Sequence, residues 1–212
     1  MNTLILFATL LTAASPVETG SLIFLQNADK VVDIQTGSEI DHVAMVIRVD
    51  GKPWVYEATP PKVRRMPLHD YYKEIATLNV SRKDPVRFWL MQPTKSFTKQ
   101  ESAKMKSYLD SQIGRRYSIR GYVRDKEGDG IHCAEFTANM LTRTGKLRFA
   151  KCYNENPSTL LKKVRPLYET KSEIGLAIPK KQESWCDRQW KWWGDFSSWC
   201  GWSSYETWTF CR

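Results

Sequence analysis

The stretch GDGIHCAEFTANML, residues 128–141, joins a glycine-rich approach to a cysteine and then to an apolar-periodic helix. Gly128 and Gly130 allow a sharp backbone turn, and the helix has an apolar face that starts at Phe136. Cys133 is therefore expected at the N-terminus of a helix, where backbone N–H groups and the helix dipole favour a thiolate. The same N–H groups can stabilise an oxyanion after attack on a carbonyl.

Position alone leaves two interpretations of Cys133 open. Most single cysteines are small core residues, whereas a nucleophile needs a base and the base needs an orienting group. His42 begins a β-branched run, and Glu57 lies near the end of the run that follows. In a hairpin that turns at Asp50-Gly51, positions 42 and 57 lie roughly opposite each other near the open end. His42 is therefore the candidate base and Glu57 its candidate partner, with a simple strand-edge histidine as the alternative.

The other two histidines fit the role of base less well. His132 precedes Cys133 directly, and adjacent residues on a helix point apart. His69 lies in a basic, tyrosine-rich segment that is typical of a surface.

Strand patterns fill the first half of the chain and helical patterns the second. The predicted strands are residues 21–26, 42–49, 53–58, 62–68 and 86–92, and one helical turn is expected at 69–75. Helices are predicted at 102–113, 132–143 and 158–164, the first with a capping box from Thr98 and the last capped by Asn156. This order predicts an α+β fold with an antiparallel sheet packed on helices.

The composition is that of a folded protein with a positive charge. The 212 residues are 42% apolar and 26% charged, which suits one sizeable core with or without a small appendage. The net charge of +9 favours contact with an anionic surface such as lipid, a cell-wall polymer or nucleic acid. Basic residues are scattered and no nucleic-acid motif occurs, so no specific nucleic-acid partner is expected.

The N-terminus resembles an export signal. Residues 1–15, MNTLILFATLLTAAS, contain an apolar run followed by small residues, although no Lys or Arg precedes the run. A cleaved leader would make the protein periplasmic or secreted. The alternative is a buried first helix or strand in a cytoplasmic protein.

The five cysteines do not define a pairing. They are Cys133, Cys152, Cys186, Cys200 and Cys211. An odd number leaves at least one thiol unpaired, and an exported protein could form a disulfide among the last three. No CxxC occurs and the three histidines lack the spacing of a zinc site, so neither a metal nor another cofactor is expected.

Residues 183–212 differ in composition from the rest. They hold seven of the nine tryptophans and follow an expected hinge near 178–181. Three interpretations are open: an aromatic flap packed on the main domain, a surface that stacks on sugars, or a belt that lies at a membrane interface. The tryptophan spacing alone gives no clean helical stripe.

A longer segment, residues 112–141, resembles the cysteine segment of the NlpC-type papain-like cell-wall peptidases. In that family a Gly-x-x-Tyr element precedes an Asp-Cys-Ser-Gly helix start, and here Gly114-Arg-Arg-Tyr117 and His132-Cys133-Ala134-Glu135 hold those places. The histidine His42 precedes the cysteine by 91 positions, whereas ordinary members place it afterwards. That order is the mark of the circularly permuted branch.

Three further segments resemble the YiiX/YaeF-like permuted amidases of that branch. They are TGSLIFLQN (19–27), EIDHVAMVI (39–47) and WVYEATPPKVRRMPL (54–68). Departures from the family pattern include Ser21 for Asp and the substitutions at Asp41 and Ala44. The resemblance covers about residues 19–165, which suggests a permuted papain-like catalytic domain at 19–178 with a Trp-rich C-terminal appendage.

The resemblance implies a Cys–His–Glu triad, with Cys133 as nucleophile, His42 as base and Glu57 orienting the imidazole. It also implies that Tyr117 helps to hold the oxyanion or the substrate, with a packed aromatic as the alternative. The expected activity is hydrolysis of an amide, peptide or ester bond through an acyl-enzyme, on a cell-wall or lipid-linked substrate. Two other functions stay open: an acyltransferase of the lecithin–retinol type, and a non-catalytic protein that binds wall or lipid.

Overall fold

The computed structural model describes residues 16–28, 40–80, 82–170, 172–175, 189, 192–194 and 196–203. Its named strands and helices, with η for a short 3-10 helix, are β1 (Leu22–Gln26), β2 (His42–Val49), β3 (Lys52–Thr59), β4 (Lys62–Pro67), α2 (Leu68–Val80), β5 (Arg87–Met91), α3 (Lys99–Gln112), α4 (Arg120–Arg124), α5 (Cys133–Thr144), η1 (Cys152–Asn154), α6 (Pro157–Val164), η2 (Arg165–Leu167) and β6 (Ser172–Glu173).

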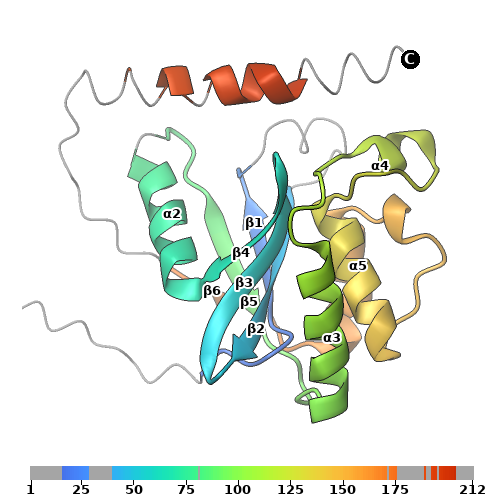
Figure 1. The fold of residues 1–212 in the computed structure, drawn as a ribbon. Helices are drawn as coiled ribbons and strands as arrows, with labels where there is room; N and C mark the ends of the chain where they lie inside the picture. Colours follow the sequence, from blue (N-terminus) through green and yellow to red (C-terminus); the bar gives the residue numbers. More distant parts are fainter. Residues whose placement is uncertain are drawn as a thin grey trace, which may run out of the picture.

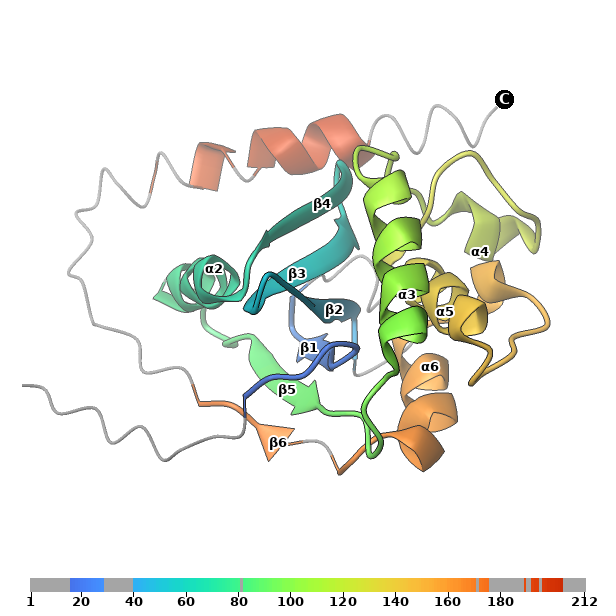
Figure 2. The ribbon, with the colours of Figure 1, turned by 60° about the horizontal axis from the view of Figure 1, so that its bottom comes forward.

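The strands form a six-stranded antiparallel sheet in the order β4-β3-β2-β1-β5-β6. Helices α3, α5 and α6 cover one face of this sheet, and α2 covers the other (Figures 1 and 2). Each face therefore has its own hydrophobic cluster, here called the α5-face core and the α2-face core. The architecture is the α+β class that the sequence predicts.

Strand β3 shows how the sequence supplies both clusters. Tyr56 and Ala58 belong to the α5-face core, with Trp54 packed against it, whereas Val55 belongs to the α2-face core. Side chains alternate between the faces of a sheet, so Glu57 projects on the same side as Val55. The predicted alternation along this strand is confirmed.

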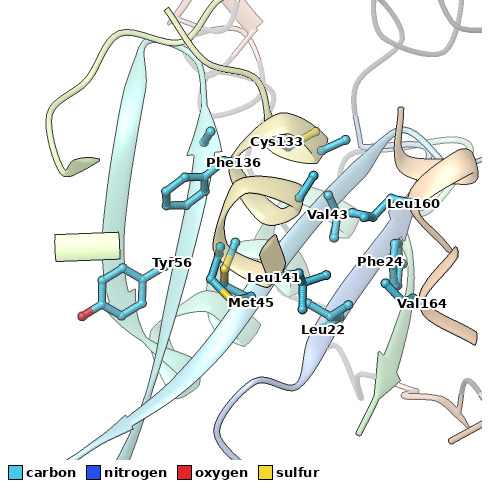
Figure 3. Packing of buried hydrophobic residues seen from close by; sticks show 14 of the residues in the cluster. Leu22, Phe24, Val43, Met45, Tyr56, Cys133, Phe136, Leu141, Leu160 and Val164 are labelled. Atoms are coloured by element: carbon cyan, nitrogen blue, oxygen red, sulfur yellow. The ribbon is translucent and has the colours of Figure 1, made fainter. Parts of the chain in front are cut away.

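Helix α5 runs through the centre of its cluster. Figure 3 shows Leu141 beside Met45 and Leu22 of the strands, with Phe136 one turn nearer the start of the helix. Phe136 and Leu141 are fully buried, and burial of a side chain of this size contributes about 1.5–3 kcal/mol. This packing holds the first turn of α5, and hence Cys133, in place against the sheet.

The predicted helix ends are largely confirmed. Thr98 and Glu101 form a capping box at the start of α3, and Asn156 caps α6. Gly145 ends α5 with a φ of 78°, a left-handed conformation that glycine adopts without strain. The turn predicted at 69–75 was too short, because α2 has 13 residues and buries Leu68, Tyr71 and Ile75 against the sheet.

Several sequence predictions concern residues outside the described ones, including the leader at 1–15, the hinge at 178–181, and Cys186 and Cys211. Cys133, Cys152 and Cys200 are free thiols. In the C-terminal segment the backbone is helical at 192–194 and 196–203. Among the described residues, no helix has both the length and the apolar character needed to cross a membrane.

Candidate functional site

The candidate nucleophile is the first residue of α5. His132 is the N-cap, with an extended backbone (φ −104°, ψ 170°), and its Nδ1 accepts a hydrogen bond of 3.3 Å from the N–H of Glu135. The other ring nitrogen, Nε2, lies 3.0 Å from the carbonyl oxygen of Tyr153. Because Nδ1 accepts, Nε2 carries the proton and donates it to that carbonyl. The cap thus holds the start of α5 and with it the sulfur of Cys133.

His42 and Glu57 are in direct contact. His42 Nε2 lies 2.7 Å from Glu57 Oε2, although the two residues come from neighbouring strands. The register Met45↔Tyr56 places them diagonally across the β2–β3 pair rather than directly opposite. Since His42 is the first residue of β2, its ring lies at the end of the sheet, where it reaches partners on both sides.

Cys133 lies close enough to the rings of His132 and His42 for both imidazoles to stabilise its thiolate. Burial alone would raise the pKa of this thiol, but the two rings outweigh that effect and lower it to about 6. Burial likewise disfavours a charged His42, yet the neighbouring thiol of Cys133 and the hydrogen bond to Glu57 raise its pKa well above the usual value. The arrangement therefore favours a thiolate beside an imidazolium near neutral pH.

His132 and Cys133 are not two adjacent residues of one helix, as the sequence predicted, because His132 has an extended backbone and stands just before the helix. Both of its ring nitrogens already bond to backbone groups. His42 has Nδ1 available to the sulfur, because Nε2 is bonded to Glu57. Of the two rings, His42 is therefore the one placed to accept a proton.

Arg64 of β4 is a part of the site that sequence reasoning did not single out. Its Nε donates to Glu57 Oε1 over 2.7 Å, and its terminal nitrogen lies 2.6 Å from Glu74 of α2. Burial would raise the pKa of Glu57, but the hydrogen bond to His42 and the charge of Arg64 lower it below the usual value. The signal in the sequence was the Arg64-Arg65 pair on the strand next to β3, whose alternation puts one arginine on the side of Glu57.

Tyr117 lies on the segment that runs beside the approach to Cys133. It forms a parallel bridge with Ile131, and its side chain is buried. Its ring centroid is 6.1 Å from that of Trp202 in the C-terminal helical segment. Tyr117 is therefore in the neighbourhood of the nucleophile, and it also joins the Trp-rich segment to the main domain.

The three candidate catalytic residues are buried. The exposed fraction is 1% for Cys133, 3% for Glu57 and 8% for His42. A buried thiolate and imidazolium stabilise each other more strongly than an exposed pair does.

Comparison with known proteins supports the fold. A solved structure described as "metalloprotein yiiX from Escherichia coli O157:H7, DUF1105" matches with a TM-score of 0.53 and 15% sequence identity, over 77% of this chain and 99% of that chain. No family model and no curated protein matches. The chain therefore has a YiiX-like fold.

Proposed function

We propose that this protein is a cysteine hydrolase of the permuted papain-like kind that cleaves an amide or ester bond through an acyl-enzyme. The observation that carries the proposal is the 2.7 Å bond between His42 and Glu57, with the His42 imidazole lowering the pKa of the Cys133 thiol at the N-terminus of α5. A nucleophile, a base and an orienting carboxylate in mutual reach are the parts that such a reaction needs.

In the first half of the reaction, the thiolate of Cys133 attacks the substrate carbonyl carbon and a sulfur–carbon bond forms. The carbonyl oxygen becomes an oxyanion, which N–H groups at the start of α5 stabilise. The oxyanion collapses, the bond to the amine or alcohol breaks, and the imidazolium of His42 gives its proton to that leaving group.

In the second half, water attacks the thioester while His42 takes its proton. Collapse of the new tetrahedral intermediate releases the carboxylic acid and restores the thiolate. Glu57 keeps the imidazole oriented through its 2.7 Å bond to Nε2, and Arg64 keeps Glu57 in its ionised form. In this proposal Tyr117 helps to hold the substrate or the oxyanion.

The YiiX neighbour is described as a metalloprotein. This raises the question whether the His, Cys, Asp and Glu side chains of this chain are placed to bind a metal ion. Among the residues that the structure describes, no group of three His, Cys, Asp or Glu side chains is placed to hold an ion. Near Cys133, Nε2 of His42 is bonded to Glu57, and both nitrogens of His132 are bonded to backbone groups. These residues do not fit a metal centre, and the proposed reaction uses none.

The test is to trap the acyl-enzyme with a panel of p-nitrophenyl esters of different acyl groups. We expect a burst of one p-nitrophenolate per protein molecule and a mass increase of one acyl group, located on Cys133 by peptide mapping. Cys133→Ala should abolish the burst and the mass increase. The matched control is Cys152→Ala, because the Cys152 thiol has a pKa raised by burial and should not be acylated.

Acylation of Cys152 instead of Cys133, or an equal burst in Cys133→Ala, would contradict the proposal. Hydrolysis and acyl transfer share the acyl-enzyme, so product analysis with and without an added amine acceptor separates the two. A hydrolase releases mainly the free acid even when the amine is present.

A further inference from the structure

A basic cavity lies beside the loop that leads into Cys133. Its volume is about 220 Å³, and its charged lining residues are four cations and two carboxylates: Arg116, Arg120, Arg124, Lys126, Glu127 and Asp129. Neither Cys133 nor His42 lines it. The cavity is therefore separate from the candidate catalytic residues, although α4 and its loop lie beside the start of α5 (Figure 1).

Two residues that line the basic cavity, Arg116 and Ser118, are linked by backbone hydrogen bonds to the segment that leads into Cys133. The N–H of Ile131 donates to the Arg116 carbonyl over 3.0 Å, and the N–H of Ser118 donates to the Ile131 carbonyl over 3.2 Å. Ile131 is two residues before Cys133. Gly130 and Ser118, both buried lining residues, pack closely across this connection. These backbone hydrogen bonds therefore fix the position of the basic cavity relative to Cys133.

Arg115 holds the loop at residues 128–130, which lines the basic cavity. Its guanidinium donates to the carbonyl oxygens of Gly128, Asp129 and Gly130 over 3.3, 3.2 and 3.0 Å. Backbone carbonyl oxygens repel an anion. Here three successive carbonyl oxygens accept hydrogen bonds from the positively charged side chain of Arg115. The backbone of this loop therefore opposes an anion little, and the four cations outnumber the carboxylates Glu127 and Asp129 of the same lining.

We propose that the basic cavity binds a phosphate or carboxylate group carried by the substrate, while the substrate's scissile carbonyl lies at Cys133. This inference rests on the proposed function and adds the substrate class, an anionic ester or amide. Four of the six charged lining residues are cations, and three of these four are arginines, whose guanidinium groups favour phosphate and carboxylate. Cavities that enclose a whole ligand are about 300–1,000 Å³, so this smaller one suits a single charged group.

The test compares alkylation of Cys133 by anionic iodoacetate and by neutral iodoacetamide. Both reagents form the same sulfur–carbon bond as iodide leaves, so the ratio of their rates reports the attraction of an anion toward the sulfur. We expect Arg116→Gln/Arg120→Gln to lower the iodoacetate-to-iodoacetamide ratio about fivefold or more, since two positive charges are lost near the sulfur. The iodoacetamide rate should change little.

The matched control removes two exposed positive charges elsewhere, in Lys52→Gln/Lys83→Gln. If this control lowers the ratio as much as the arginine variant, the effect is that of net charge and the proposal is overturned. Should the arginine variant fail to fold, Arg124→Gln/Lys126→Gln at two exposed lining positions serves in its place. A slow iodoacetamide reaction in the unmodified protein would instead contradict the proposed function, so the two failures are distinguishable.

Two competitors identify the source of the anion. Inorganic phosphate should slow the iodoacetate reaction if the basic cavity takes a free phosphate, compared with chloride at equal ionic strength. Phosphatidylglycerol vesicles should slow it if the cavity takes a lipid headgroup, compared with phosphatidylcholine vesicles. Loss of either competition in the arginine variant supports the proposal. Equal competition in the variant and the unmodified protein overturns it.

Discussion

At the scale of single residues, the position of His42 at the end of β2 decides its chemistry. A histidine further along the strand would face one cluster only, because side chains alternate between the faces. At the strand end the ring bonds to Glu57 and also lies close enough to Cys133 to stabilise its thiolate. Arg64 bonds to Glu57 and to Glu74, so two carboxylates share one guanidinium and only one of them touches the histidine.

Glu57 contacts both Arg64 and His42, whereas Glu74 contacts Arg64 but not His42, so variants of the two residues form a matched pair. In the unmodified protein, iodoacetamide alkylation of Cys133 should rise through a midpoint near pH 6, the pKa of its thiol, and level off above it because the thiolate is the reactive form. Glu57→Gln removes the negative charge that stabilises the imidazolium. The midpoint should then move to higher pH, and the rate at pH 7 should fall about fivefold or more.

Glu74→Gln is the control, because it also removes a partner of Arg64 but leaves the His42–Glu57 contact intact. Its pH profile should match that of the unmodified protein. A midpoint near 8.5, the ordinary cysteine value, in the unmodified protein would show that the thiol is not activated.

At the scale of elements, the loop and helix around residues 128–141 depend on close backbone packing. A Cβ built on Gly130 would lie 2.4 Å from the Cβ of Ser118 and 3.1 Å from the carbonyl oxygen of Arg116. At Gly128 the nearest atom would be 3.8 Å away, an ordinary contact. The two glycines that look alike in the sequence therefore have different roles, and Gly130 is the one that the approach to Cys133 requires.

Alanine substitutions at the two glycines test this difference. Gly130→Ala should force the loop away from Ser118, lower the free energy of unfolding by about 1–3 kcal/mol, and slow alkylation of Cys133. Gly128→Ala should leave both quantities nearly unchanged. The measurements are thermal unfolding and iodoacetamide kinetics, and equal behaviour of the two variants would contradict the assigned role of Gly130.

At the scale of the whole molecule, the C-terminal helical segment joins the main domain through Trp202. Trp202 packs against the α5-face core and contacts Tyr117, whereas Trp192, Trp193 and Trp199 are each at least half exposed. The rings of Trp192, Phe196 and Trp199 stack in sequence along the segment. Their spacing is helical once Phe196 is counted, which the tryptophan positions alone did not show.

The contact of Trp202 with Tyr117 predicts that this segment limits access to the closed site. Trp202→Ala should raise the rate of iodoacetamide alkylation of Cys133 several-fold, because the indole packed beside Tyr117 is lost. Trp199→Ala is the control, since Trp199 lies on the same segment with half of its surface exposed. A rate that is unchanged in Trp202→Ala would show that another group covers the sulfur.

Local patterns predicted much of the fold. The bounds of β2, the caps of α3 and α6 and the glycine at the end of α5 follow from residues within one or two turns of each feature. Helix α4 and strand β6 were not predicted. Helix α4 has five residues, and β6 pairs only two residues with β5, so each depends on distant contacts more than on its own sequence.

The sequence by itself determined the α+β class, most of the elements, and the placement of Cys133 at the start of a helix, because these depend on side-chain periodicity and capping over short distances. Only the tertiary structure decided that His42, Glu57 and Arg64 from three strands form one bonded group, and that the ring of His132 caps α5. It also decided that the site is closed and that a basic cavity lies next to it. The physical reason is that such contacts depend on strand register and on the packing of helices against the sheet, which involve residues far apart in the chain.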